Sequence, residues 1–117
     1  MKLIEDQLAS PKGFRAAGMA CGLKPDGEKD LALIVSDRPA SAAGMFTTNR
    51  VQAAPLHLNR EHLQGGRARA ILVNSRNANA CTGEQGLADA QKSARLVADG
   101  LGLASEEVLV NSTGVIG

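Results

Sequence analysis

The chain has 117 residues, enough for one domain or part of one, and with 44% hydrophobic and 21% charged residues its composition is globular rather than disordered. A net charge of +1 argues against a nucleic-acid-binding surface, which needs a clustered excess of Lys and Arg. No apolar run reaches the roughly 20 residues of a membrane-spanning helix. Because the N-terminus also lacks the apolar stretch of a signal peptide, we expect a cytoplasmic location and no membrane partner.

The residue types limit how a core can be built. Aromatic residues make up only 2%, so the core must consist of Ala, Leu, Val and Ile, which bury less area per residue. The two cysteines, Cys21 and Cys81, have neither the spacing of a metal site nor that of a disulfide framework. We interpret them as buried free thiols, and we expect neither a metal nor a resident cofactor.

In the first half of the chain, Gly and Pro divide residues 9–30 into short extended pieces and turns, with a clear turn signal at residues 25–27. Residues 30–36 form a short apolar run that fits a buried strand. A second strand is predicted at residues 40–48, in a hairpin with the first. Around Pro55 we expect extended chain, and Asn59 reads as the N-cap of a short helical turn that ends at Gly65–Gly66.

In the second half, a third strand is predicted at residues 68–73, followed by an Asn-rich loop at 74–81 and the best helix signal in the chain. Thr82 and Gln85 match a capping box at its start, and Gly100 and Gly102 end it. One face is apolar and the opposite face carries the charge pairs Asp89–Lys92 and Arg95–Asp99; the apolar positions are Leu87, Ala90, Ala94, Val97 and Leu101. A fourth strand at 108–111 completes a strand–loop–helix–strand order, which predicts an α/β or α+β layered fold.

Three segments could carry chemistry, and each has a plain structural alternative. The helix start at residues 82–86 could hold an anion, although capping alone explains it and Glu84 opposes a phosphate. The Asn side chains of residues 74–79 could orient a polar substrate or simply form turns. The Ser112–Gly114 segment, directly after a strand, could present a hydroxyl and backbone amides to an oxyanion or could be an ordinary turn. His57 and His62 could act as bases, but no Ser, Cys or Asp stands near either in an arrangement that the sequence can verify, which favours exposed or structural histidines.

Four blocks, in this order and spacing, resemble the ornithine acetyltransferase family of arginine biosynthesis along nearly the whole chain. They are residues 11–18 (PKGFRAAG), 43–51 (AGMFTTNRV) with Ala54–Pro55, 77–83 (NANACTG) and 112–117 (STGVIG). Arg76 departs from the pattern, since many members have Gly at this place in the loop.

The resemblance implies an acetyl transfer from N-acetylornithine to glutamate, and in some members acetyl-CoA is also a donor substrate. In that family a precursor cuts itself before a Thr, and this new N-terminal Thr forms an acetyl-enzyme. Family members place the oxyanion hole at a Thr-Gly pair, which corresponds here to Thr113 and Gly114, with the Thr113 hydroxyl or amide and the Gly114 amide as donors. A related self-processing amidohydrolase and a non-catalytic anion-binding module remain alternatives.

The resemblance also implies that residues 1–117 are the N-terminal portion of the family's alpha chain. The segment with the nucleophilic Thr is not within these residues, so the chain is expected to be inactive alone. Its partners would be the remainder of the alpha chain and the beta chain, in an α2β2 assembly. The family fold is a layered sandwich of sheets with outer helices, and part of such a sandwich should self-associate through exposed strand edges and apolar surface.

Overall fold

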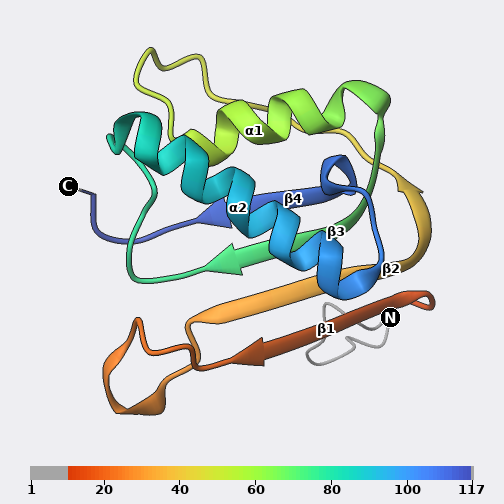
Figure 1. The fold of residues 1–117 in the computed structure, drawn as a ribbon, viewed down its shortest axis with the longest axis horizontal. Coiled ribbons are helices and arrows are strands. Elements are labelled where there is room, and N and C mark those ends of the chain that lie inside the picture. The colour runs from red at the N-terminus through yellow and green to blue at the C-terminus, as the bar shows by residue number, and fades with distance from the viewer. Residues whose placement is uncertain (1–10, 117) are drawn as a thin grey trace, which may run out of the picture.

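A computed structural model describes residues 11–116, which form one four-stranded mixed sheet and two α-helices (Figure 1). The strands lie side by side in sequence order, with β1–β2 and β2–β3 antiparallel and β3–β4 parallel. Their bounds are β1 (Phe14–Met19), β2 (Leu31–Ser41), β3 (Arg67–Asn74) and β4 (Val108–Ser112). The predicted α/β class is therefore confirmed, with the strand–loop–helix–strand unit forming the parallel half of the sheet.

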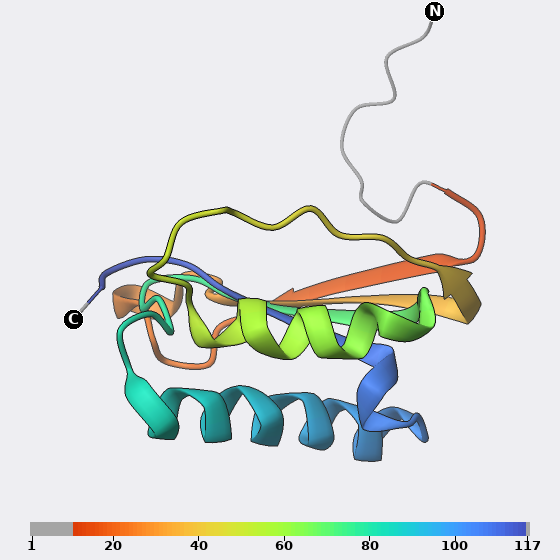
Figure 2. The same ribbon diagram turned by 90° about the horizontal axis from the view of Figure 1, so that it is seen from above.

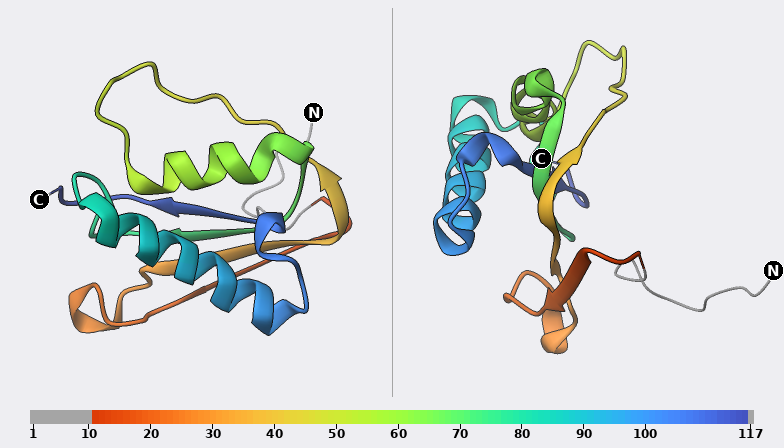
Figure 3. Two further views of the ribbon diagram at one scale, coloured as in Figure 1. Left: turned by 45° about the horizontal axis from the view of Figure 1, so that its top comes forward. Right: turned by 90° about the vertical axis from the view of Figure 1, so that its right-hand side faces the viewer.

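The two helices do not lie in the same position relative to the sheet. Viewed along the strands, α2 (Gly83–Leu101) covers one face, while α1 (Ala54–His62) lies beyond the β4 edge (Figure 3). Residues 42–53 run on the side of the sheet away from α2 (Figure 2). Most of the other face therefore has no helix on it among the described residues. None of the described helices is long and apolar enough to cross a bilayer.

Two of the strand predictions need correction. The predicted strand at 40–48 is wrong, because β2 ends at Ser41 and residues 42–49 are irregular. The hairpin partner of β2 is β1, in a segment where only short extended pieces and turns were expected. Every residue of β1 is exposed, so this edge strand carries no alternation of buried and exposed residues that a sequence pattern could reveal. The predicted turn is confirmed as a short 3-10 element at Pro25–Gly27.

The first helix was also misplaced by the sequence. α1 begins at Ala54 and includes Pro55 in its first turn, where a missing N–H costs nothing because no helical partner exists for it. Asn59 is therefore not an N-cap. It lies in the helix interior, is buried, and uses both ends of its amide on Val110: Nδ2 donates to the carbonyl (2.8 Å) and Oδ1 accepts from the amide (2.9 Å).

The second helix packs through very small residues. The residues of α2 that are buried are Gly86, Ala90, Ala94 and Ala98, and with Val35, Leu58 and Val108 the alanines form the core. Of the predicted apolar face, Leu87 and Leu101 stay exposed, because a Gly/Ala stripe allows closer helix approach than leucines would. Neither predicted charge pair is formed; the ion pairs found in residues 11–116 are Arg15–Asp37 and Lys24–Glu28.

Asp30 anchors the turn that joins β1 to β2. Its buried carboxylate accepts hydrogen bonds from the backbone amides of Cys21 (2.7 Å), Leu23 (2.6 Å) and Lys24 (2.9 Å). These amides, that of Cys21 first, hold the pKa of Asp30 well below its usual range. The same carboxylate, chiefly through a hydrogen bond, raises the pKa of the Cys21 thiol. Cys21 and Cys81 are free but exposed, so the prediction that they are buried is wrong.

Candidate functional site

At the exit of β4, Thr113 and Gly114 form a turn that is tied to the end of β3 on both sides. The amide of Thr113 donates to the carbonyl of Asn74 (3.1 Å), and the amide of Val115 donates to the carbonyl of Arg76 (2.7 Å). Between them, the amide of Gly114 has no partner among residues 11–116, and neither has the hydroxyl of Thr113. Both residues are exposed. The turn thus presents two unused donors side by side.

The backbone at Gly114 can be occupied only by glycine. Its φ of 133° is disfavoured for residues with a side chain. A Cβ there would also lie 2.7 Å from the Cα of Arg76 and closer still to its carbonyl group. Arg76 itself has a φ of 94°, in the region of backbone conformation that favours glycine. The segment after β3 and the segment after β4 therefore bend at the same level, and their backbones are in contact at Arg76 and Gly114.

The hydrogen bonds along β4 show which backbone groups near the turn are already in use. The carbonyl of Val108 lies 2.8 Å from Nδ1 of His62, and Val110 pairs with Asn59, so both of these strand residues direct their backbone groups toward α1. Thr113 and Val115 donate to the opposite side, toward β3. The amide of Gly114, which lies in the turn after β4 with a φ of 133°, is not among the donors to β3. Since the Thr113 amide is committed to Asn74, the predicted oxyanion donors reduce to the Gly114 amide and the Thr113 hydroxyl.

The Asn-rich loop is the other half of this site. Asn74 Nδ2 donates to the carbonyl of Asn77 (2.9 Å), and Asn79 Nδ2 donates to the carbonyl of Gly86 (2.7 Å). Asn77 and Val115 form a parallel bridge that places the loop beside the residues after the turn. The side chains of Asn74 and Asn79 thus serve the protein's own backbone, which favours the structural interpretation of this loop over a direct role in orienting substrate.

Comparison with known proteins identifies the family. The ArgJ family model matches residues 15–117. The chain belongs to the ArgJ family. It is 51% identical to the arginine biosynthesis bifunctional protein ArgJ of Caldanaerobacter subterraneus and 54% identical to that of Synechocystis, matches that cover 100% and 99% of this chain. These matches span only 29% and 28% of the two relatives, and the matched part is N-terminal.

Solved structures of ArgJ proteins have the same fold. The ArgJ crystal structure from Bacillus halodurans superposes with a TM-score of 0.91 at 44% identity, over 96% of this chain and 59% of that one. The ornithine acetyltransferase of Mycobacterium tuberculosis, solved in complex with ornithine, gives a TM-score of 0.89 at 47% identity, over 93% of this chain and 60% of that one. The fold described above is therefore that of the matching part of ArgJ proteins.

The other candidate residues of this ArgJ-family chain take different positions. His62 is half-buried against β4 and structural, because its Nδ1 must carry the proton that Val108 accepts. His57 is exposed and, with Cys81 and Thr82, lines a small cavity of about 190 Å³ at the start of α2. No cluster of His, Cys, Asp and Glu able to hold a metal ion occurs in the part of the chain that the structure describes.

The predicted capping box at the start of α2 is not formed. The Thr82 hydroxyl donates to Oδ1 of Asn79 instead of accepting from a backbone amide, and Gln85 Nε2 donates to Asp89 Oδ1 (2.9 Å). Asn79 therefore contacts the start of α2 through the Gly86 carbonyl and the Thr82 hydroxyl, and no side chain caps a backbone amide there. Two residues have contacts beside the site that the sequence did not predict: the hydroxyl of Ser112 pairs with the loop, and Asn59 covers the neighbouring edge of β4.

Proposed function

We propose that this chain is part of an acetyltransferase that moves an acetyl group from N-acetylornithine to glutamate, through an acetyl ester on a threonine outside residues 1–117. The observation that carries the proposal is the pair of free donors at Thr113–Gly114, in a chain of the ArgJ family. In this scheme the chain supplies the oxyanion-stabilising turn and is inactive alone. Acetyl-CoA can serve as a second donor substrate, no resident cofactor is needed, and the reaction takes place in the cytoplasm.

The chemistry explains why two such donors matter. A threonine hydroxyl adds to the acetyl carbonyl and its proton passes to a base, so the carbonyl oxygen becomes negatively charged. Collapse of this intermediate expels the amine of ornithine with a proton and leaves the acetyl ester. The neutral amine of glutamate then adds to the ester and forms a second oxyanion; the amine gives up a proton to the base, and the threonine oxygen takes a proton back as it leaves. Donors fixed in a water-poor site stabilise both oxyanions, and losing one typically costs about 10²–10³ in rate.

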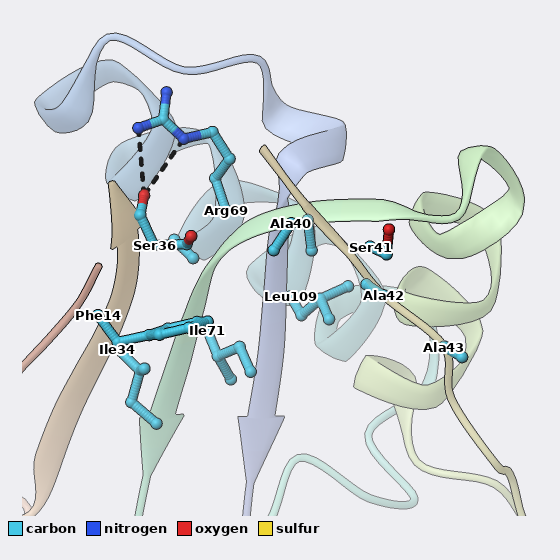
Figure 4. A pocket seen from close by; sticks show the side chains of 12 residues that line it. Phe14, Ile34, Ser36, Ala40, Ser41, Ala42, Ala43, Arg69, Ile71 and Leu109 are labelled. Atoms are coloured by element: carbon cyan, nitrogen blue, oxygen red, sulfur yellow. Dashed lines mark hydrogen bonds between the residues drawn. The ribbon is translucent and has the colours of Figure 1, made fainter. Parts of the chain in front are cut away.

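The helix-free face of the sheet supports an assembly with further chain. Phe14, Ile34, Ile71 and Leu109 project from it and line a cavity of about 280 Å³ (Figure 4). Beside them, the guanidinium of Arg69 satisfies carbonyls where the β2–β3 register shifts (Figure 4). Such an apolar face needs a covering layer. We propose that the remainder of the alpha chain and the beta chain provide it, in an α2β2 assembly, since this chain spans under a third of its curated relatives.

Two alternative functions use the same features. A self-processing amidohydrolase would pass through the same tetrahedral intermediate, and it differs only in using water where the transferase uses glutamate. A non-catalytic anion-binding module would use the start of α2, where the cavity beside Thr82 is the observation in its favour. Titration with phosphate or CoA, followed by NMR at the amides of residues 82–86, tests the module, and unchanged spectra at millimolar concentrations would exclude it.

A chimera provides the test of the transferase. Residues 1–117 replace the matching segment of the Mycobacterium tuberculosis ornithine acetyltransferase, the native enzyme serves as positive control, and products are measured with and without glutamate. We expect N-acetylglutamate to form, and Thr113→Ala to lower kcat by about 10²-fold with little change in KM. Thr48→Ala, at another exposed threonine, is the control and should change nothing. A folded, processed chimera without acetyl transfer would refute the proposal, and acetate formation that ignores glutamate would favour the hydrolase.

A further inference from the structure

The Ser112 side chain occupies an unusual place at the end of β4. Its hydroxyl donates to the carbonyl of Asn77 (2.9 Å) and accepts from the amide of Asn79 (3.1 Å). Both partners are backbone groups of the loop that faces the Thr113–Gly114 turn. Ser112 is the residue immediately before that turn, and it is half-buried. One side chain thus joins the strand that delivers the donors to the loop beside it.

The strand pairing is interrupted at the level where Ser112 acts, although backbone hydrogen bonds flank the turn on both sides. The β3–β4 pairing ends at Asn74 and Ser112, and it resumes in the same register at Asn77 and Val115. Between these points both segments of the chain leave the extended conformation, with positive φ at Arg76 and Gly114. The Ser112 hydroxyl spans this interruption, because it starts on β4 before the turn and reaches loop residues beyond it.

The loop residue that Ser112 contacts is itself fixed to both helices. The carbonyl of Asn79 accepts from the amide of Ala54 at the start of α1 (3.1 Å). Its side chain donates to the carbonyl of Gly86 in the first turn of α2 (2.7 Å) and accepts from the Thr82 hydroxyl. A Cβ at position 86 would overlap both Thr82 and Asn79, so the small residue there is what lets Asn79 fit. Through Ser112, the turn is therefore connected to the starts of α1 and α2.

We propose that Ser112 is a positioning residue, which holds the Gly114 amide and the Thr113 hydroxyl at the distance and angle that the oxyanion requires. This inference rests on the proposed acetyl transfer. Ser112 acts through the turn and does not touch the reacting atoms. Oxyanion donors act at 2.7–3.1 Å, and a misplacement of about 1 Å can cost about 10² in rate. A serine that only satisfied one loop carbonyl and one loop amide would affect stability, and its loss would not lower kcat selectively while leaving KM unchanged.

The test uses the chimera described above and compares near-isosteric substitutions. Ser112→Thr keeps the hydroxyl, whereas Ser112→Val has almost the same shape, suits a strand, and lacks it. We expect Ser112→Val to lower kcat by about 10- to 100-fold with KM within about twofold, and Ser112→Thr to retain kcat within about threefold of the parent. Ser112→Ala should behave like Ser112→Val if it folds. Hydrogen exchange at residues 112–116 should increase in the valine variant and not in the threonine variant.

Ser93 provides a matched control. It is also half-buried, and its hydroxyl also donates to a backbone carbonyl, that of Asp89 (2.7 Å), but this bond lies within α2. Ser93→Ala should leave kcat and KM unchanged. If Ser112→Val and Ser112→Thr have equal kcat while Thr113→Ala is slow, the positioning role is refuted and the oxyanion turn stands. If Thr113→Ala is also as fast as the parent, the Thr113 hydroxyl is refuted as an oxyanion donor, and Gly114→Ala then decides whether the Gly114 amide has that role.

Discussion

Replacing Gly114 with alanine tests the oxyanion turn most severely. The new Cβ would lie 2.7 Å from the Cα of Arg76, whereas ordinary contacts begin near 3.4 Å, so the two backbones must separate by about 0.7 Å there and by more at the Arg76 carbonyl. The φ of 133° adds strain for any residue with a side chain. A displacement approaching 1 Å at an oxyanion donor predicts that kcat falls by about 10²-fold or more.

The assay is acetyl transfer by the chimera at saturating N-acetylornithine and glutamate, with KM measured in parallel. Gly100→Ala is the matched control, because a Cβ at Gly100 meets no atom within 4 Å and its φ is not positive. We expect the control to keep full activity, and the Gly114→Ala variant to retain its secondary structure by circular dichroism. Turnover within about twofold of the parent in folded Gly114→Ala would show that the position of this amide does not matter for the reaction.

Three further predictions concern stability, each followed by thermal unfolding of the chain. Asp30→Asn should lower Tm at neutral pH. Because the folded pKa of Asp30 is depressed, the stability that its carboxylate contributes is complete above the unfolded pKa of about 4 and is lost as the pH falls below it. The Tm values of the parent and the variant should therefore converge in acid. A difference in Tm that stays constant down to pH 2 would contradict this. Asn59→Ala should cost about 1–3 kcal/mol, because it leaves buried groups of Val110 unpaired, whereas Asn49→Ala on the surface should cost little. Leu58→Ala should cost about 2–5 kcal/mol, since this side chain is 2% exposed in the core, and a loss under 1 kcal/mol would mean that the core is packed differently.

The parallel half of the fold was predictable because its signals are local. The runs at 68–73 and 108–111 are apolar, and the intervening helix has a strong 3.6-residue period. The errors arise where tertiary contacts override local preference. Pro55 looked like a break in regular structure, yet it starts α1. Thr82 and Gln85 fit a capping box, yet Asn79, held by three other segments, captures the threonine hydroxyl.

The candidate site shows the same division. The resemblance placed Thr113 and Gly114, and a strand followed by Thr-Gly is visible in the sequence. Which of their donors is free is not visible, because it depends on pairing with residues far away in the chain. The Thr113 amide is taken by Asn74, whereas the Gly114 amide has no partner among residues 11–116. Ser112 was part of the motif without a role, since its partners lie in a loop more than 30 residues earlier.

The free amide at Gly114 has a cause in how α1 meets β4. An edge strand exposes donors and acceptors that attract other strands, and here His62 covers Val108 and Asn59 covers Val110. Toward the exit of β4 lies the N-terminal start of α1, whose unpaired backbone groups are N–H donors and not carbonyls, so it offers no acceptor to the Gly114 amide. The covering therefore stops where the turn begins. An oxyanion that approaches Gly114 would meet a donor for which α1 provides no competing acceptor, beside a strand edge already closed to other chains.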